Sequence, residues 1–129
     1  MFPTRRLDPI AQRLESFGFS RTASDQLSRS GTFHRLPAGA VLCREGERGL
    51  EAFLLLEGVA EVQLTDTTVR IGPGDVVGEL ATLDPRRTRN ATVVAASDVT
   101  LLVYDARTFC SLADDEELRG HLRPERAAA

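Results

Sequence analysis

The chain has 129 residues, a length that suits one domain with a core of its own. Its composition of 42% hydrophobic and 27% charged residues is ordinary for a folded, soluble protein. The formal net charge of -3 and the pI of about 5.4 argue against a basic surface for nucleic acids, so we expect no nucleic-acid partner.

No segment predicts a membrane anchor or a secretion signal. The N-terminus lacks a sufficiently long apolar stretch, and the longest apolar run, residues 52–56, is too short to cross a bilayer. We therefore expect a cytoplasmic protein without membrane insertion. Cys43 and Cys110 are far apart in the sequence and are predicted to be two buried free thiols, with a disulfide as the alternative.

The N-terminal segment predicts two short helices. Asp8 is a suitable N-cap, and Pro9 fits the first helical position. Apolar residues recur on one face of this first helix, at Ile10, Leu14 and Phe17, and Gly18 ends it. Thr22 and Asp25 have the spacing of a capping box, which predicts a second helix that ends near Gly31.

From residue 32 the pattern changes to short apolar or alternating runs between turn signals, which is typical of a β-sandwich or barrel. The strand candidates are 32–36, 41–44, 52–56, 59–64, 68–71, 75–77, 90–95 and 100–104. Within 59–64, Ala60 and Val62 alternate with Glu61 and Gln63, so one face should be buried and the other solvated. The turn at 65–67 predicts a hairpin with 68–71.

Helical signals return after Tyr104. Asp105 is the expected N-cap of a helix that turns Phe109 and Leu112 inward, and a short final helix should carry Leu118 and Leu122. We expect one unit over residues 1–129. Its parts are N-terminal helices at 1–31, a sheet region at 32–104 and C-terminal helices at 105–123.

The segment at 78–94, GELATLDPRRTRNATVV, carries the chemistry of an anion site. Gly78 lacks a Cβ, so a ligand can approach the main chain, and a turn that begins near Leu80 would aim backbone N–H groups at an anion. Glu79 can accept a hydrogen bond from a sugar hydroxyl. The planar guanidinium of Arg89 can bind phosphate oxygens in a bidentate manner. Together these groups suit a small ribose phosphate.

An ordered series of motifs resembles the cyclic nucleotide-binding domain family. The motifs are RLPAGAVLCREGERG at 35–49, FLLLEGVAEV at 53–62, GPGDVVGELATL at 72–83 and RNATVVA at 89–95. The resemblance implies a mainly β fold: a β-roll, or jelly-roll-like double-stranded β-helix, with two short helices at each end. It also implies that residues 78–94 form the phosphate-binding cassette.

The resemblance implies a role for each site residue. Glu79 would bind the ribose 2′-hydroxyl, and backbone groups of Gly78, Glu79, Leu80 and Ala81 would meet the ribose and the cyclic phosphate. Arg89 would pair with the phosphate charge. Asn90 could contact phosphate or base, which leaves the preference between cAMP and cGMP open. The base would lie against Val62, Thr68, Val69 and Val77.

The arginine that binds the phosphate has competitors. The family often has proline directly before this arginine, whereas here that position is Thr88, and Pro85 and Arg86 stand three residues earlier. Arg86 or Arg87 could therefore take the role. We favour Arg89 because R-x-A-T leads directly into the next strand, in the register of the family.

The predicted function is non-enzymatic sensing or buffering of cAMP, with cGMP as the other candidate, through an unidentified protein partner. No cofactor or metal is expected, because two isolated histidines do not form a metal site and no catalytic group of residues is evident. A homodimer is left open. The alternative function is a degenerate fold that acts as a protein-interaction module without ligand, for which Thr88, Asn90 and the short final helix argue.

Overall fold

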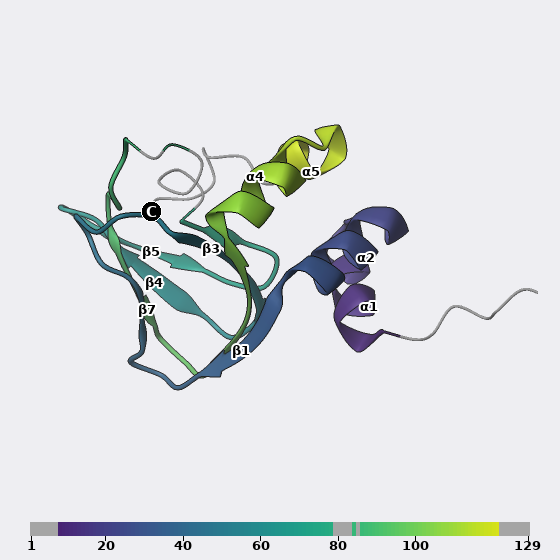
Figure 1. The fold of residues 1–129 in the computed structure, drawn as a ribbon. Coiled ribbons are helices and arrows are strands. Elements are labelled where there is room, and N and C mark those ends of the chain that lie inside the picture. The colour runs from purple at the N-terminus through teal and green to yellow at the C-terminus, as the bar shows by residue number, and fades with distance from the viewer. Residues whose placement is uncertain (1–7, 79–83, 85, 122–129) are drawn as a thin grey trace, which may run out of the picture.

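The computed structural model describes residues 8–78, 84 and 86–121 (Figure 1). The helices are α1 (Pro9–Ser16), α2 (Arg21–Ser30), α4 (Ala106–Ala113) and α5 (Glu116–His121). The strands are β1 (Thr32–Leu36), β2 (Val41–Cys43), β3 (Glu51–Glu57), β4 (Ala60–Gln63), β5 (Thr68–Ile71), β6 (Val76–Val77), β7 (Thr92–Ala95) and β8 (Val99–Asp105). The predicted order of helices and strands is confirmed, and the strand ends differ from the prediction by at most two residues.

The strands form two four-stranded antiparallel sheets. One has the order β1-β8-β3-β6 and the other the order β2-β7-β4-β5. The predicted hairpin is confirmed, since β4 pairs with β5 from Ala60 opposite Ile71 to Gln63 opposite Thr68. Among the described strands no pairing joins one sheet to the other, so the two sheets do not form a closed barrel. The arrangement is the expected β-roll.

Strand β3 is buried on both faces, which explains its unbroken apolar sequence. Ala52, Leu54 and Leu56 pack in a cluster with the helices. Phe53 and Leu55 face the opposite way and pack in a second cluster with residues of the other sheet. The sheet that contains β3 and β8 is thus the middle layer, between the helices and the sheet of β4, β5 and β7 (Figure 1).

The cap of α1 is confirmed, and the cap predicted for α2 is wrong. Asp8 Oδ1 accepts a hydrogen bond from the N–H of Ile10 at 3.0 Å. The N-cap of α2 is Ser20, whose Oγ accepts from the N–H of Ala23 at 3.1 Å, and Thr22 lies inside the first turn. The cap needs an extended backbone just before the helix, and Ser20 has it, with φ -64° and ψ 166°.

The first C-terminal helix, α4, begins after the predicted N-cap, Asp105. Asp105 caps α4 by accepting from the N–H of Thr108 at 2.8 Å, and Phe109 and Leu112 are buried as expected. Leu118 on α5 is fully buried, whereas Leu122 lies outside the described residues.

Neither cysteine forms a disulfide, and only one of the two is buried. Cys43 on β2 is buried, and Cys110 on α4 is exposed, so the prediction of two buried thiols is wrong for Cys110. The cause is the helical period, because α4 turns Phe109 and Leu112 toward the core and leaves Cys110 on its solvent side.

Candidate functional site

Arg89 is a buried cation held by backbone carbonyls. Its side chain is only 5% exposed. Nη1 donates to the carbonyl oxygen of Gly78 at 2.7 Å, and Nη2 donates to the carbonyl oxygen of Glu51. The guanidinium carbon lies 6.0 Å from the centroid of the Phe53 ring. Gly78, the residue directly after β6, and Glu51, the first residue of β3, therefore fix this side chain in one place.

The main chain of Arg89 is fixed by the loop between β2 and β3. Its N–H donates to the carbonyl of Glu47 at 2.7 Å, and its carbonyl accepts from the N–H of Gly46 at 2.9 Å. Arg48, next to Glu47, and Thr88, next to Arg89, form an isolated antiparallel bridge. No local signal in the sequence of residues 45–49 predicts these contacts with Arg89.

Gly78 leaves room for the arginine. A Cβ built on Gly78 would lie 2.2 Å from Nη1 of Arg89 and 3.2 Å from the carbonyl oxygen of Glu51. Its φ of +86° is in the left-handed region, which strains other residues. The sequence suggests glycine here so that a ligand can approach the main chain, and the geometry adds the arginine as a second reason.

The positive charge of Arg89 is not neutralised by a described carboxylate. Among residues 8–78, 84 and 86–121, no ion pair involves its guanidinium, and two of the five N–H groups that an arginine carries have acceptors. A buried charge is normally paired, because desolvation of an isolated ion is costly. The arrangement therefore suits an anionic ligand.

Arg86 and Arg87, the competing arginines, are both exposed. Both lie beside Asp84, with Nε of Arg86 3.2 Å from Oδ1 and Nε of Arg87 3.7 Å from Oδ2. The backbone N–H of Arg86 also donates to Asp84, and mainly for this reason the pKa of that carboxyl lies below its ordinary value. Both arginines thus have a local carboxylate, whereas Arg89 has no ion pair among the described residues.

The residues expected to contact a base do not share one face. Val62 and Val69 are opposite each other in the β4–β5 ladder, and Val62 and Val77 belong to the buried cluster between the sheets. Val69 is 43% exposed on the edge strand β5. Thr68 is opposite exposed Gln63, on the outer face, because successive strand residues point to opposite faces. The register thus places Val62 and Val69 on the inner face of this ladder, and it separates Thr68 from them. Val77, on β6 of the other sheet, meets Val62 in the buried cluster.

The remaining predicted site residues are described only in part. Asn90 is exposed next to Arg89. Glu79, Leu80 and Ala81 lie outside the described residues. Within the described part of the chain, no group of three His, Cys, Asp or Glu side chains could hold a metal ion, and no helix has the length and apolar character of a membrane span.

Comparison with known proteins identifies the family. The family model described as the cyclic nucleotide-binding domain matches residues 33–116, which span most of the strands, the segment around Arg89 and helix α4. The chain therefore belongs to the cyclic nucleotide-binding domain family.

Two similar curated proteins come from bacteria. One is a cyclic nucleotide-gated potassium channel of Rhizobium etli, 46% identical over 76 residues, which are 57% of this chain and 21% of the channel. Another is a Pycsar effector protein of Pseudomonas aeruginosa, 36% identical over 90 residues, 69% of this chain and 29% of the effector. The chain spans less than a third of either relative.

Solved structures support the fold. The regulatory domain of Toxoplasma gondii PKA, co-crystallised with cAMP, has a TM-score of 0.72 at 23% identity, covering 89% of this chain and 49% of that one. The structure of PKAR CBD2 bound to Sp-2Cl-cAMPS has a TM-score of 0.73 at 22% identity, covering 87% and 78% of the two chains. Both share the β-roll and its flanking helices with this chain.

Proposed function

We propose that this chain is a non-catalytic binding module for a cyclic nucleotide, with cAMP as its ligand, and that it acts through a protein partner. The observation that carries the proposal is Arg89. It is a buried guanidinium, held on two carbonyls, with no ion pair to a described carboxylate. A cyclic phosphate carries a single negative charge on two exposed oxygens, which matches the fork of an arginine.

The other roles follow from the position of Arg89. Gly78 would bring backbone groups to the phosphate, joined by Leu80 and Ala81, and Glu79 would accept a hydrogen bond from the ribose 2′-hydroxyl. The base would extend toward the inner face of β4 and β5, where Val62 and Val69 lie opposite each other. Asn90, exposed beside Arg89, would contact the phosphate or the base.

The choice of cAMP is supported by relatives. Solved structures of similar fold hold cAMP or a cAMP derivative. Another structural neighbour belongs to a cyclic-GMP-dependent signalling pathway of bacterial phytopathogenesis, so cGMP is the natural competitor. Calorimetric titration of the parent protein with each nucleotide tests the choice, and tighter binding of cGMP would reverse it.

The phosphate role is tested by Arg89→Ala, with Arg87→Ala as the matched control. Loss of one partner of a buried charge pair costs about 2–5 kcal/mol, or roughly 30-fold to 5,000-fold in affinity. Arg87 is exposed and lies beside Asp84, so its replacement should leave affinity within about twofold of the parent. Isothermal titration with cAMP measures both. Parent-like binding by the Arg89 variant would show that the assignment is wrong.

The ribose role is tested with an analogue in the same titrations. Glu79→Gln should weaken cAMP more than 2′-deoxy-cAMP, because the analogue lacks the hydroxyl that the carboxylate would accept from. Equal losses for the two ligands would remove Glu79 from the ribose contact and leave the role of Arg89 untouched.

A ligand-free interaction module is the second candidate function. It is favoured by Thr88, which pairs with Arg48 in a bridge, and by the exposed Asn90, since both depart from the family pattern. A thermal-shift assay against cAMP, cGMP and ATP separates the candidates, because a ligand that binds only the native state raises the melting temperature. A melting temperature unmoved by all three nucleotides would favour the second candidate.

The proposal also covers the chain as a whole. We take residues 1–129 as one folding unit that works in the cytoplasm. In support of one unit, a single buried cluster contains Leu14 and Leu27 from the N-terminal helices, Leu54 from β3, and Phe109 and Leu118 from the C-terminal helices. Limited proteolysis should therefore leave one protected fragment that contains both groups of helices.

A further inference from the structure

The loop between β2 and β3 lies against the chain segment that contains Arg89. We call residues 44–48 of this loop the latch loop. All of them are exposed, so none of their own side chains anchors the loop in the core. The N–H of Glu47 donates to the carbonyl of Arg44 at 3.2 Å, and Gly46 has the φ of +85° that the third residue of a type II turn requires. Hydrogen bonds rather than apolar packing therefore hold the loop against its neighbour.

Three hydrogen bonds join the latch loop to this neighbouring segment. Two are main-chain bonds of Arg89, whose N–H donates to the carbonyl of Glu47 at 2.7 Å and whose carbonyl accepts from Gly46 at 2.9 Å. The third uses a side chain, because the N–H of Glu45 donates to Oγ1 of Thr92 at 3.1 Å. Any residue type can make the main-chain bonds, so Thr92 is the position at which the amino-acid sequence controls the contact.

Thr92 holds its hydroxyl in place without being part of the core. It is the first residue of β7, where it lies opposite Gln63 in the ladder with β4. It is half-buried and faces away from the inner side of the sheet, whereas the next residue, Val93, belongs to the buried cluster between the sheets. The strand thus fixes the position of the hydroxyl, and its removal would leave no cavity in the core.

The closed latch loop matters for the anion site because it fixes the main chain of Arg89. The carbonyls of Gly78 and Glu51 hold the guanidinium, and the latch loop holds the peptide groups from which this side chain extends. When the loop opens, the main chain of Arg89 loses both of these bonds. The apparent affinity for a ligand scales with the fraction of the protein that is in the competent form, here the closed form.

We propose that Thr92 is a positioning residue for the anion site: its hydroxyl keeps the latch loop closed, and the closed loop holds Arg89 in position for the phosphate. Thr92 acts through the loop and not by contact with the ligand. The inference rests on the proposed function only for the identity of that ligand, because the effect of Thr92 on the loop exists without nucleotide.

Two substitutions of Thr92 test the effect on the loop. Thr92→Val keeps the branched side chain and removes the acceptor, whereas Thr92→Ser keeps the acceptor. In NMR measurements without nucleotide, the amides of Gly46 and Arg89 should exchange about three- to tenfold faster in Thr92→Val, which corresponds to the net free energy of one hydrogen bond. Thr92→Ser should exchange at the parent rate. Neither amide loses its own acceptor, so faster exchange reports opening of the loop.

Calorimetric titration with cAMP on the same samples tests the effect on the site. Because every residue of the latch loop is exposed, its closed form is only marginally stable, and loss of one bond lowers the closed fraction. Thr92→Val should therefore bind cAMP about three- to tenfold more weakly than the parent, and Thr92→Ser should restore the affinity.

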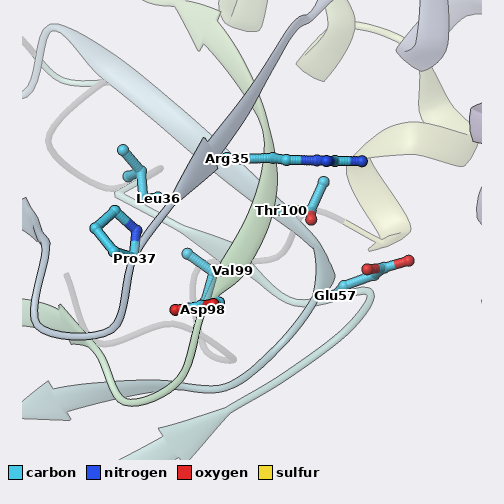
Figure 2. A pocket seen from close by; sticks show the side chains of 7 residues that line it. All are labelled: Arg35, Leu36, Pro37, Glu57, Asp98, Val99 and Thr100. Carbon is cyan, nitrogen blue, oxygen red and sulfur yellow. The ribbon is translucent and has the colours of Figure 1, made fainter.

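Thr100→Val is the matched control. Thr100 is also a strand threonine, on β8, and its hydroxyl has no hydrogen bond among the described residues. It lines a cavity of about 440 Å³ (Figure 2) and is opposite Glu57, the last residue of β3. The carbonyl that holds Arg89 belongs to Glu51, the first residue of β3, roughly 20 Å away at the rise of an extended strand. Exchange at Arg89 and affinity for cAMP should match the parent.

A pair of glycine substitutions opens the loop by another route. Gly46→Ala strains the turn through its positive φ, although the added Cβ meets no atom within 4 Å. Gly39 is its matched control, because it has a φ of +92°, equally open space and the same place in a hydrogen-bonded turn at 37–40. Gly46→Ala should repeat the faster exchange at Arg89 and the weaker binding of cAMP, and Gly39→Ala should show neither.

Three results would overturn the proposal. The first is parent exchange rates for Gly46 and Arg89 in Thr92→Val. The second is faster exchange with parent affinity for cAMP, which would show that closure of the loop does not serve the site. The third is a loss of affinity that Thr92→Ser fails to restore. If the parent bound neither cAMP nor cGMP, the proposed function would fail, and the exchange rates would still decide whether Thr92 holds the loop.

Discussion

Replacement of Gly78 by alanine gives the sharpest test of how the buried arginine is held. The new Cβ would lie 2.2 Å from Nη1 and 3.0 Å from Cζ of Arg89, so the guanidinium has to move. Although a long side chain can usually shift at little cost, here both terminal nitrogens are hydrogen-bonded to carbonyl oxygens. The substitution therefore disrupts the anion site and the packing beneath it.

A second variant, Gly39→Ala, separates the cost of backbone strain from the cost of displacing the arginine. Gly39 also has a positive φ, +92°, but its added Cβ would meet no atom within 4 Å. Its replacement measures the backbone strain alone, about 1–2 kcal/mol. Gly78→Ala should add the loss of a hydrogen bond to a charged donor, about 1.5–3 kcal/mol, for a total of about 2.5–5 kcal/mol.

Urea unfolding of the two variants gives the difference in the free energy of unfolding, and titration with cAMP gives the difference in affinity. We expect Gly39→Ala to bind cAMP as the parent does and Gly78→Ala to bind at least tenfold more weakly. If the two variants lost equal stability and both kept parent affinity, Arg89 would not depend on the space above Gly78, and this account of the site would be refuted.

Two further predictions concern the helix layer. Tyr104→Phe removes the hydrogen bond from the buried hydroxyl to the carbonyl of Leu27, 2.6 Å away, and should cost about 1–3 kcal/mol in urea unfolding. Burial also raises the pKa of Tyr104 above its ordinary value of 10.0, so the folded state keeps the proton that the unfolded state loses. The parent should lose stability as the pH rises above about 10, and Tyr104→Phe should lessen that decline. Identical dependence of the unfolding free energy on pH in the two proteins would contradict this prediction. Ser20→Ala removes the cap of α2 and the 2.9 Å hydrogen bond from Ser20 Oγ to Glu117 on α5. It should cost about 1–2 kcal/mol of unfolding free energy and make amide exchange in α5 faster. Unchanged exchange in α5 would show that the contact with Ser20 does not hold this helix.

Much of the fold could be predicted from the sequence because its signals are local. Alternation of Ala60 and Val62 with Glu61 and Gln63 indicates one buried face whatever the rest of the chain does. Asp8 and Asp105 cap helices through N–H groups within three residues of themselves. The error at Thr22 also has a local cause, because two candidate caps stand close together and only the backbone of Ser20 is extended.

The site could be predicted only in part. Gly78 and Arg89 were recognised as a pair from residue type and from the resemblance to the family, and the structure brings them together at 2.7 Å. The other contacts of the arginine, with the carbonyls of Glu47 and Glu51, could not be predicted, since they join segments about 40 residues apart through main-chain atoms that any residue type carries.

The amino-acid sequence by itself determined the strands, the helices, most of the caps and the family, because hydrophobic period, capping chemistry and motif order are properties of short segments. Only the tertiary structure decided that Arg89 is buried on two carbonyls while Arg86 and Arg87 remain in solvent beside Asp84. It likewise decided that Phe33 and Arg35 lie on β1, the end strand of its sheet among the described strands. The physical reason is that burial and charge compensation depend on which distant segments pack together, and arginines of identical chemistry differ only in that environment.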